Sequence, residues 1–300
     1  MPTKSDIEDA VKTAVKYDCP SELELAFFGG SFTMIEREKM LFYLDVAKTL
    51  VEEYGLHGIR FSTRPDGINE EVMRIIEGYP VTAIELGAQS MDDGVLIASM
   101  RGHTATDTEK AAGLIKRAGK ELVLQMMVGM PESCFEKELD TAKKLAGLLP
   151  DAVRIYPVLV LEGTELARQY RAGEYEPIAL EKAVETSAEL ISFFEDNDIS
   201  VIKVGLQAEE GFDSKKTLVA GPYHQAFREL CEGSLYLKKI LKDYRGGDAV
   251  ILCNSRELSK VKGHKKENEL RLKELYPTSD FIFQTTDELS KGEIVVKRRA

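Results

Sequence analysis

The stretch Ala26-Phe27-Phe28-Gly29-Gly30-Ser31-Phe32-Thr33 ends an apolar run, residues 22–28, and precedes a helix-period pattern that begins near Ile35. This order predicts a strand, a tight glycine turn and then a helix. Glycine lets the backbone approach a ligand closely, and the turn exposes N–H groups that can hold an anion or a polar group. Taken alone, the turn is explained equally well as an ordinary βα corner, because such loops are commonly short and rich in glycine.

The alternation of strand and helix continues along the chain. Apolar runs that predict strands lie at residues 22–28, 58–63, 81–87, 121–128, 152–158 and 199–205. Helix-period stretches lie at 5–17, where Ser5 is the expected cap, and at 35–54, 69–78, 92–98, 106–118, 135–147 and 179–196. The pattern predicts right-handed βαβ units in an α/β fold, which we expect to be a partial (β/α)6-type barrel of parallel strands.

Polar residues interrupt the apolar pattern at or just past the carboxyl ends of five predicted strands. They are Gly29 to Ser31, Ser62 to Asp66, Gln89 with Ser90, Gly129 to Pro131, and Tyr156. In barrels and in open α/β sheets this edge is where ligands bind. Five polar loops on one edge therefore predict a single site.

Composition limits the classes of function. The chain has 300 residues, is 43% hydrophobic and carries a net charge of −11, so no general attraction to nucleic acid is expected, although a local basic patch stays open. The sequence has no apolar run long enough for a membrane helix and no signal peptide at its polar start. Its four cysteines, Cys19, Cys134, Cys231 and Cys253, are widely spaced, which predicts reduced thiols in a cytoplasmic protein.

The pattern changes near residue 207, and we expect two domains: 1–207 as the partial barrel and 208–300 as a small α+β region. Residues 208–217 are expected to be a loop. A turn at 221–224 should open a helix that ends near 231, and a second helix should cover 234–243. Further elements are expected as strands at 248–253, 280–284 and 293–297 and helices at 256–260 and 265–275.

Residues 256–275 hold seven Lys or Arg against four Glu. The turn 261–268 faintly resembles the Gly-x-x-Gly turn of the KH fold, which clamps nucleic-acid backbone, although Lys266 stands where the second glycine would be. Lys262, Lys265 and Lys266 are the candidate nucleic-acid contacts. The alternative is a solvated amphipathic helix with Leu270, Leu272 and Leu275 turned inward.

An ordered set of motifs resembles the radical S-adenosylmethionine superfamily, and within it the branch that contains the Elongator catalytic subunit and proteins similar to oxygen-independent coproporphyrinogen III oxidase. The motifs cover roughly residues 22–207. They are FFGGSF at 27–32, STRPD at 62–66, ELGAQS at 85–90, RGHT at 101–104, QMMVGMP at 125–131, RIYPVLVLEGT at 154–164 and GEYEP at 173–177.

The resemblance implies S-adenosylmethionine as cofactor. Gly29, Gly30 and Ser31 stand where the family holds the methionyl amino group, and Arg101 would suit the methionyl carboxylate, because a guanidinium pairs with a carboxylate through two bonds. Gln125 stands where the family has a polar residue near the ribose. The remaining expected cofactor residues are Arg64, Gln89 and Ser90, which would line the same cavity, and Tyr156, which would face cofactor or substrate.

Each of these residues also has a simpler explanation. Arg64 and Arg101 could be ordinary surface arginines, and Gln89 and Gln125 could be satisfied buried amides. Ser31 could cap the following helix, a role compatible with ligand binding. Two further residues are expected to be structural: His103 as a loop residue, and His224, which has no second metal ligand spaced to help it.

The sequence differs from the family in the segment that would bind the iron–sulfur cluster. The family needs a [4Fe–4S] cluster on three cysteines, spaced Cys-x3-Cys-x2-Cys, before the glycine motif. This chain has only Cys19 before Gly29, and its next cysteine is Cys134, so it contains no expected metal ligand. The first family strand is missing as well. We favour a truncated form of a longer enzyme, and a relative that lost its cluster is the alternative.

Three functions remain open. The first is a radical enzyme domain, inactive as this chain alone, whose complete form would cleave S-adenosylmethionine, act on a tRNA base and need a reductant protein. The second is a cluster-less module that binds RNA or a nucleoside. The third, an unrelated barrel enzyme, lacks a nucleophile–base pair or a His-rich metal set in the sequence.

Overall fold

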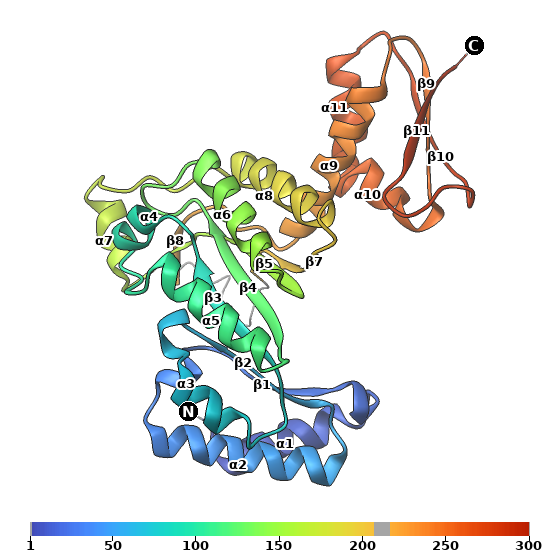
Figure 1. The fold of residues 1–300 in the computed structure, drawn as a ribbon. Helices are drawn as coiled ribbons and strands as arrows, with labels where there is room; N and C mark the ends of the chain where they lie inside the picture. Colours follow the sequence, from blue (N-terminus) through green and yellow to red (C-terminus); the bar gives the residue numbers. More distant parts are fainter. Residues whose placement is uncertain (1, 207–216, 300) are drawn as a thin grey trace. The chain divides into compact units, whose positions relative to one another are not determined.

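A computed structural model describes residues 2–206 and 217–299 of the chain (Figure 1). These residues form two compact units. The first comprises Met1–Arg154 with Asn197–Ile202, and the second comprises Ile155–Asp196 with Lys203–Ala300, each taken over its described residues. The expected loop at 208–217 and the expected domain boundary at 207/208 fall on the residues outside the described part, so the division into 1–207 and 208–300 stays a prediction.

The main sheet of the described residues has six strands in the order β1-β2-β3-β4-β5-β7. Their bounds are β1 Glu24–Phe27, β2 Gly58–Thr63, β3 Val81–Gln89, β4 Glu121–Val128, β5 Ala152–Pro157 and β7 Ser200–Val204. The β1/β2, β2/β3 and β3/β4 pairs are parallel. The prediction of an α/β fold with a partial barrel of parallel strands is confirmed.

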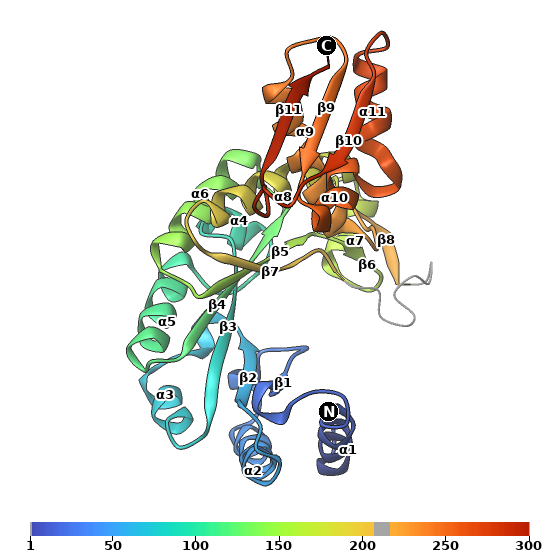
Figure 2. The same ribbon diagram turned by 90° about the vertical axis from the view of Figure 1, so that its right-hand side faces the viewer.

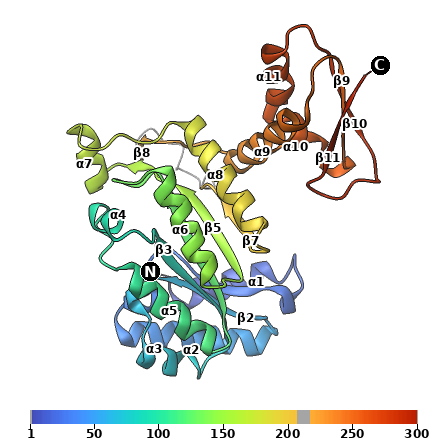
Figure 3. The ribbon, with the colours of Figure 1, turned by 45° about the horizontal axis from the view of Figure 1, so that its top comes forward.

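The described helices of the first unit are α1 Lys4–Ala14, α2 Arg37–Tyr54, α3 Glu70–Ile76, α4 Asp93–Ala98, α5 Ala105–Arg117 and α6 Phe135–Gly147. A side chain accepts from a free N–H group at the start of α1, α3, α4 and α5, whereas α2 and α6 have no such cap. Thr3, and not Ser5 as expected, caps α1 in a reciprocal bond pattern with Asp6. Thr104 and Asp107 make the same capping box at α5. Figure 3 shows α5 and α6 running along strands β3 and β4.

Aromatic side chains fasten the glycine turn after β1 to the outer side of the sheet. Phe27 stacks on Phe32 with 4.9 Å between ring centroids, and Phe32 lies 4.9 Å from Phe61. Phe27 also contacts Tyr43 of α2 at 5.7 Å. Burial of each such ring contributes about 1.5–3 kcal/mol to folding. The turn is therefore anchored on both of its flanks.

The second unit contains two smaller sheets and their helices. Strands β6 Val160–Leu161 and β8 Leu218–Ala220 form an antiparallel pair that the sequence did not predict, because two- and three-residue strands carry no usable period. The helices that follow β6 are α7 Glu165–Arg171 and α8 Leu180–Glu195, and α8 agrees with the predicted range 179–196.

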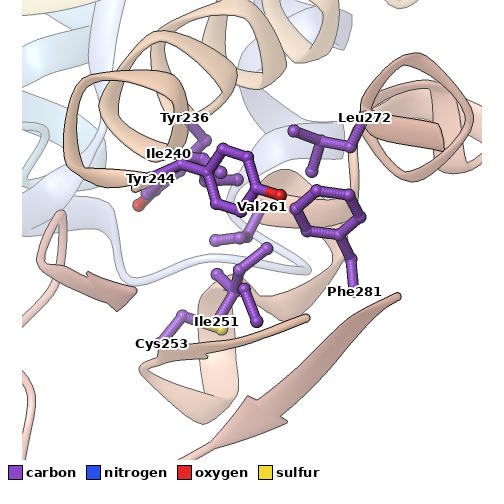
Figure 4. Close-up of a cluster of buried hydrophobic side chains, with 9 residues drawn as sticks. Tyr236, Ile240, Tyr244, Ile251, Cys253, Val261, Leu272 and Phe281 are labelled. Carbon is purple, nitrogen blue, oxygen red and sulfur yellow. The ribbon is translucent and has the colours of Figure 1, made fainter. Parts of the chain in front are cut away.

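The three-stranded sheet of this unit has the order β10-β9-β11. Strand β9 (Ala249–Cys253) is parallel to β10 (Phe281–Thr285) and antiparallel to β11 (Ile294–Arg298). Figure 2 shows its strands beside α9, α10 and α11. Figure 4 shows the shared core, in which Ile251 and Val261 lie with Leu272 and Phe281.

The sequence prediction of two helices before β9 is wrong. A single helix, α9 Phe227–Asp243, runs through Gly233 without a break. Gly233 packs closely there, because a Cβ on Gly233 would lie 3.3 Å from the Cα of Gly263 in the turn between α10 (Leu258–Lys262) and α11 (Glu267–Leu275). Among the described residues, none of the helices combines the length and the apolar character needed to cross a bilayer.

Candidate functional site

The first unit contains a cavity of about 330 Å³ at the carboxyl ends of β2, β3 and β4. Six of the nine expected cofactor residues line it, namely Gly30, Ser31, Arg64, Gln89, Arg101 and Gln125. Its other lining residues are Ser62, Thr63, Glu85, Leu86, Gly87 and Met100. The cavity therefore collects side chains that are as far as 95 positions apart in the sequence, counting from Gly30 to Gln125.

The glycine turn forms one wall of this cavity. Gly29 has a φ of 101°, which lets the chain turn sharply after β1. The Ser62 hydroxyl donates to the carbonyl of Gly30 across 3.4 Å and links the turn to β2. Ser31 precedes a short 3-10 turn but makes no side-chain capping bond, and Glu36 precedes α2. The expectation that Ser31 caps the following helix is therefore wrong.

Two arginines line the cavity, and among the described residues only one of them has its guanidinium paired with a carboxylate. Arg64 donates two bonds to Asp66, from Nε at 2.9 Å and from Nη2 at 2.6 Å, and these bonds raise the pKa of Arg64. The guanidinium of Arg101 makes no hydrogen bond or ion pair with the described residues, and its Nε is buried without a partner among them. Burial, and then the charge of Arg64, lower the pKa of Arg101. A half-buried guanidinium without a counterion favours binding of an anion.

Gly102 leaves room for the guanidinium of Arg64. Its φ is 75°, and a Cβ at this position would lie 2.8 Å from Nη2 of Arg64. Only glycine combines this backbone conformation with such a close approach. The Arg101-Gly102 pair therefore lets Arg64 stay bonded to Asp66 while Arg101 keeps its own place in the cavity.

A pair of amides forms the opposite part of the lining. Gln125 Nε2 donates to Gln89 Oε1 across 3.1 Å. Gln89 ends β3 with a φ of 65°, and the β3/β4 register shifts between Leu86 and Gln89. A non-glycine residue in this conformation costs about 1–2 kcal/mol, and such outliers concentrate at functional sites. The amides are hydrogen-bonded to each other and still line the cavity, so both of their expected roles remain compatible.

Three of the expected cofactor residues do not line the cavity. Ser90 is buried with its hydroxyl 3.3 Å from that of Thr141, so it links β3 to α6. Gly29 lies in the turn beside Gly30, and Tyr156 is a buried residue of β5 in the second unit. His103 is buried with Nε2 3.0 Å from the carbonyl of Ala88, and its Nδ1 is buried without a partner among the described residues, so its expected lack of function stays a prediction.

A ladder of charged side chains crosses the inner face of the first unit's strands, and the sequence reasoning did not select it. Arg60 donates from Nε to Glu24 at 2.6 Å and from Nη2 to Glu121 at 3.1 Å. Glu85, which lines the cavity, accepts from Arg60 at 3.4 Å and from Arg154 at 2.8 Å. Burial opposes the charge on Arg60, yet its bonds to Glu24 and Glu121 raise its pKa. The sequence signal that could have identified this ladder is the presence of charged residues at alternate positions of otherwise apolar strands.

The cysteines do not fit a [4Fe–4S] cluster, which needs thiolate ligands. Cys231 and Cys253 are buried in the second unit, and burial raises the pKa of both thiols, that of Cys231 to about 12. Cys19 and Cys134 are exposed in the first unit. Within the part of the chain that the structure describes, no three His, Cys, Asp or Glu side chains are placed to hold a metal ion.

The cavity residues do fit the methionyl part of S-adenosylmethionine. The guanidinium of Arg101, which has no partner among the described residues, suits a carboxylate, and the turn at Gly30 and Ser31 is within the same lining. The amides of Gln89 and Gln125 are donors and acceptors for hydroxyl groups. The chemistry of the lining therefore agrees with a zwitterionic nucleoside ligand.

The candidate nucleic-acid turn lies between α10 and α11. Lys265 and Lys266 have φ values of 50° and 64°, so Lys266 holds the left-handed conformation that a glycine would favour. Lys262 places Nζ 5.7 Å from the ring centroid of Phe283. Of the three α11 leucines that were expected to face inward, Leu272 is buried, whereas Leu270 and Leu275 are exposed. The nucleic-acid role of the three lysines stays a prediction.

His224 lies beside this turn and has a structural contact. Its Nδ1 accepts from the backbone N–H of Ala226 across 3.0 Å, and its ring lies edge-on to that of His264 at 5.3 Å. His264 in turn has Nδ1 3.2 Å from a carboxylate oxygen of Glu229. These contacts agree with the expectation that His224 is structural.

Comparison with known proteins finds family matches over most of the chain. Residues 2–145 match the Radical SAM superfamily, and residues 150–236 match the Radical_SAM C-terminal domain. The tRNA uridine(34) acetyltransferase of Methanocaldococcus infernus is 32% identical over 205 residues, which are 62% of this chain and 38% of that protein. Elongator complex protein 3 of Homo sapiens is 28% identical over 138 residues, 45% of this chain and 25% of that protein.

A solved structure shows the same fold. The archaeal Methanocaldococcus infernus Elp3 with an N-terminal deletion superimposes with a TM-score of 0.63 at 26% identity, covering 80% of this chain and 57% of that one. The chain spans less than two thirds of the length of these relatives. Together with the motifs and the two family matches, which follow one another along the chain, these findings show that the chain belongs to the radical S-adenosylmethionine superfamily.

Proposed function

We propose that this chain binds S-adenosylmethionine in the cavity of its first unit, as the cofactor-holding part of a radical enzyme that acts on a tRNA base. The observation that carries the proposal is Arg101, a half-buried guanidinium with no partner among the described residues and with a lowered pKa. A carboxylate is the ligand group that satisfies it best. Superfamily membership supports the choice of S-adenosylmethionine as the carboxylate-bearing ligand.

Each part of the cavity lining then has a role in binding. Arg101 holds the methionyl carboxylate. Arg64 stays paired with Asp66, so the positive charge of Arg64 is already neutralised. Gly29, Gly30 and Ser31 offer backbone groups to the methionyl amino group. Gln89 and Gln125 offer their amides to the ribose hydroxyls. In this proposal the described residues bind and orient the cofactor.

The substrate and the remaining cofactor are inferred from the relatives. The names of two similar curated proteins, both tRNA uridine(34) acetyltransferases, suggest tRNA uridine as the substrate class. The superfamily implies a [4Fe–4S] cluster, which supplies the electron for cleavage of S-adenosylmethionine, but the cysteines of this chain do not fit it. The cluster thiolates, and the reductant protein that serves the cluster, are therefore proposed to come from outside these residues. A cytoplasmic location is part of the same proposal.

Equilibrium dialysis with radiolabelled S-adenosylmethionine tests the cavity. Arg101→Gln should weaken binding by at least about tenfold, because a hydrogen bond to a charged group contributes about 1.5–3 kcal/mol. Arg117→Gln is the matched control, since Arg117 is an exposed residue whose ion pair with Glu70 lies on the surface. Equal binding by the wild type and the Arg101→Gln variant would reject the proposal.

A second candidate, an RNA-binding module without a cluster, is favoured by the distribution of charge. Residues 217–300 hold 16 Lys or Arg against 12 Asp or Glu, a net charge of +4, whereas residues 1–216 hold 24 against 39, a net charge of −15. Filter binding to tRNA at two salt concentrations tests this candidate. Salt-sensitive binding that falls in a Lys265→Glu/Lys266→Glu variant supports it. No salt-sensitive binding removes it.

A further inference from the structure

Phe28 is an exposed aromatic ring on the inner face of the sheet. Side chains alternate along a strand, so Phe28 continues the side of β1 that carries Glu24 and Ala26. Glu24 binds Arg60 of the inner ladder, which identifies this side as the inner face. Phe27, on the opposite side, packs against Phe32 and Tyr43. Phe28 keeps 54% of its surface exposed, although it is a large apolar residue.

One side of the Phe28 ring carries a guanidinium. The Cζ atom of Arg154 lies 5.5 Å from the ring centroid, within the range of a cation–π contact. Arg154 is held in this place by Glu85, whose carboxylate accepts its Nη2–H across 2.8 Å. Glu85 also accepts from Arg60, so its position is fixed from two sides. The ring therefore has an ordered arginine neighbour and a large remaining exposed area.

This ring adjoins the cofactor cavity. Glu85 lines the cavity, and Gly30, two residues after Phe28, lines it as well. The pair of Phe28 and Arg154, which we call the stacking platform, is thus linked to the cavity both through the chain and through a hydrogen bond. A flat apolar ring with a guanidinium beside it is the combination with which proteins stack unpaired bases.

We propose that the stacking platform binds the target base of an RNA strand, stacked on the exposed part of the Phe28 ring. This inference deepens the proposed function and rests on it. A base that is to react must leave its own stack and needs a replacement surface in the enzyme. Stacking on an aromatic side chain supplies that surface for any base, because every base has a π-face.

The sequence provides a clean spectroscopic test, because the chain contains no tryptophan. A Phe28→Trp variant therefore has a single tryptophan, placed on the platform. Single-stranded oligo(U) RNA should quench its fluorescence in a saturable manner, with and without S-adenosylmethionine. Phe42→Trp is the matched control, since Phe42 is 46% exposed on α2 and has a neighbouring aromatic ring, Tyr43. Its fluorescence should not change with oligo(U).

Two further variants measure the affinity. Phe28→Ala should weaken oligo(U) binding by about tenfold, within the range measured for removal of a stacking side chain, and Phe28→Tyr should restore it. Binding of S-adenosylmethionine in equilibrium dialysis should stay within about twofold in both variants, which also shows that the cavity is folded.

The outcomes separate this inference from the proposed function. If the wild type binds no S-adenosylmethionine, the proposed function fails, whatever oligo(U) does. If S-adenosylmethionine binds but oligo(U) neither quenches the Phe28→Trp variant nor distinguishes Phe28→Ala from the wild type, the platform fails alone. Quenching by S-adenosylmethionine and not by oligo(U) would assign the platform to the adenine of the cofactor and overturn the inference.

Discussion

Gln125 Nε2 donates a hydrogen bond to Gln89 Oε1 across 3.1 Å, and Gln89 holds a left-handed backbone conformation, with a φ of 65°, where it does so. The two residues lie 36 positions apart in the sequence, on β3 and β4. A hydrogen bond of this kind contributes about 1 kcal/mol, which is no more than the cost of the backbone conformation. The arrangement is therefore not explained by its contribution to stability, which leaves ligand binding as the role to test.

Gln89→Gly should separate these two effects. Glycine accepts the positive φ, so the free energy of unfolding should stay within about 1 kcal/mol of the wild type or rise. Loss of the amide should weaken S-adenosylmethionine binding about fivefold. Urea denaturation and equilibrium dialysis measure the two quantities. The control is Leu149→Gly, at an exposed residue with a φ of 54°, which should keep full binding. Unchanged binding in both variants would show that the Gln89 amide has no ligand role.

Glu85→Gln should destabilise the first unit strongly. Glu85 is 3% exposed and neutralises Arg60 and Arg154 together, so its removal leaves two partly buried guanidinium groups short of a counterion. The expected loss in the free energy of unfolding is about 3 kcal/mol. Glu121→Gln is the control, because Glu121 also binds Arg60 but is 38% exposed in its side chain. Its expected cost is below about 1 kcal/mol. Equal costs in urea denaturation would mean that the ladder acts as a surface network.

Gly102→Ala should disturb Arg64. The new methyl group would lie 2.8 Å from Nη2 of Arg64, and alanine at a φ of 75° is strained by about 1–2 kcal/mol. We expect a lower melting temperature and weaker S-adenosylmethionine binding. Gly147→Ala in α6 is the control, because nothing lies within 4 Å of its added Cβ and alanine is the better helix former. The prediction is wrong if both variants melt at the same temperature as the wild type.

The thiols should divide into two classes. Cys19 and Cys134 are exposed, whereas Cys231 and Cys253 are buried with raised pKa values, so the latter stay protonated and unreactive at neutral pH. Titration with a thiol reagent at pH 7 should modify two cysteines in the folded protein and all four after denaturation. A third rapidly reacting thiol in the folded protein would contradict the burial of this pair.

Local sequence signals predicted the elements closely where they were strong. The bounds of β2, β4 and α6 agree with the predicted ranges 58–63, 121–128 and 135–147, because the apolar period is strong in these stretches. The predictions from local sequence were wrong where tertiary packing decided the structure. Two helices were predicted, one ending near 231 and one at 234–243, but a single helix, α9, runs through Gly233, which packs closely against Gly263.

The candidate site was predictable in part. Motif order selected Gly30, Arg101 and Gln125, which the fold brings to one cavity. Ser90 was selected by the same reasoning, yet its hydroxyl lies beside Thr141 of α6. A motif indicates which residues matter without fixing the direction of each side chain, since the register shift at the end of β3 depends on its pairing with β4.

The sequence by itself determined the α/β class, the parallel direction of the strands and the edge of the sheet where the polar loops lie. These features follow from the local apolar period and from the handedness of βαβ units. Only the tertiary structure decided which charges are paired. Arg64 has Asp66 two residues away, whereas the guanidinium of Arg101 has no partner among the described residues, and Glu85 binds Arg154 of another strand. Such pairing depends on distances across the sheet, which are set by packing of the whole unit and not by any local stretch of chain.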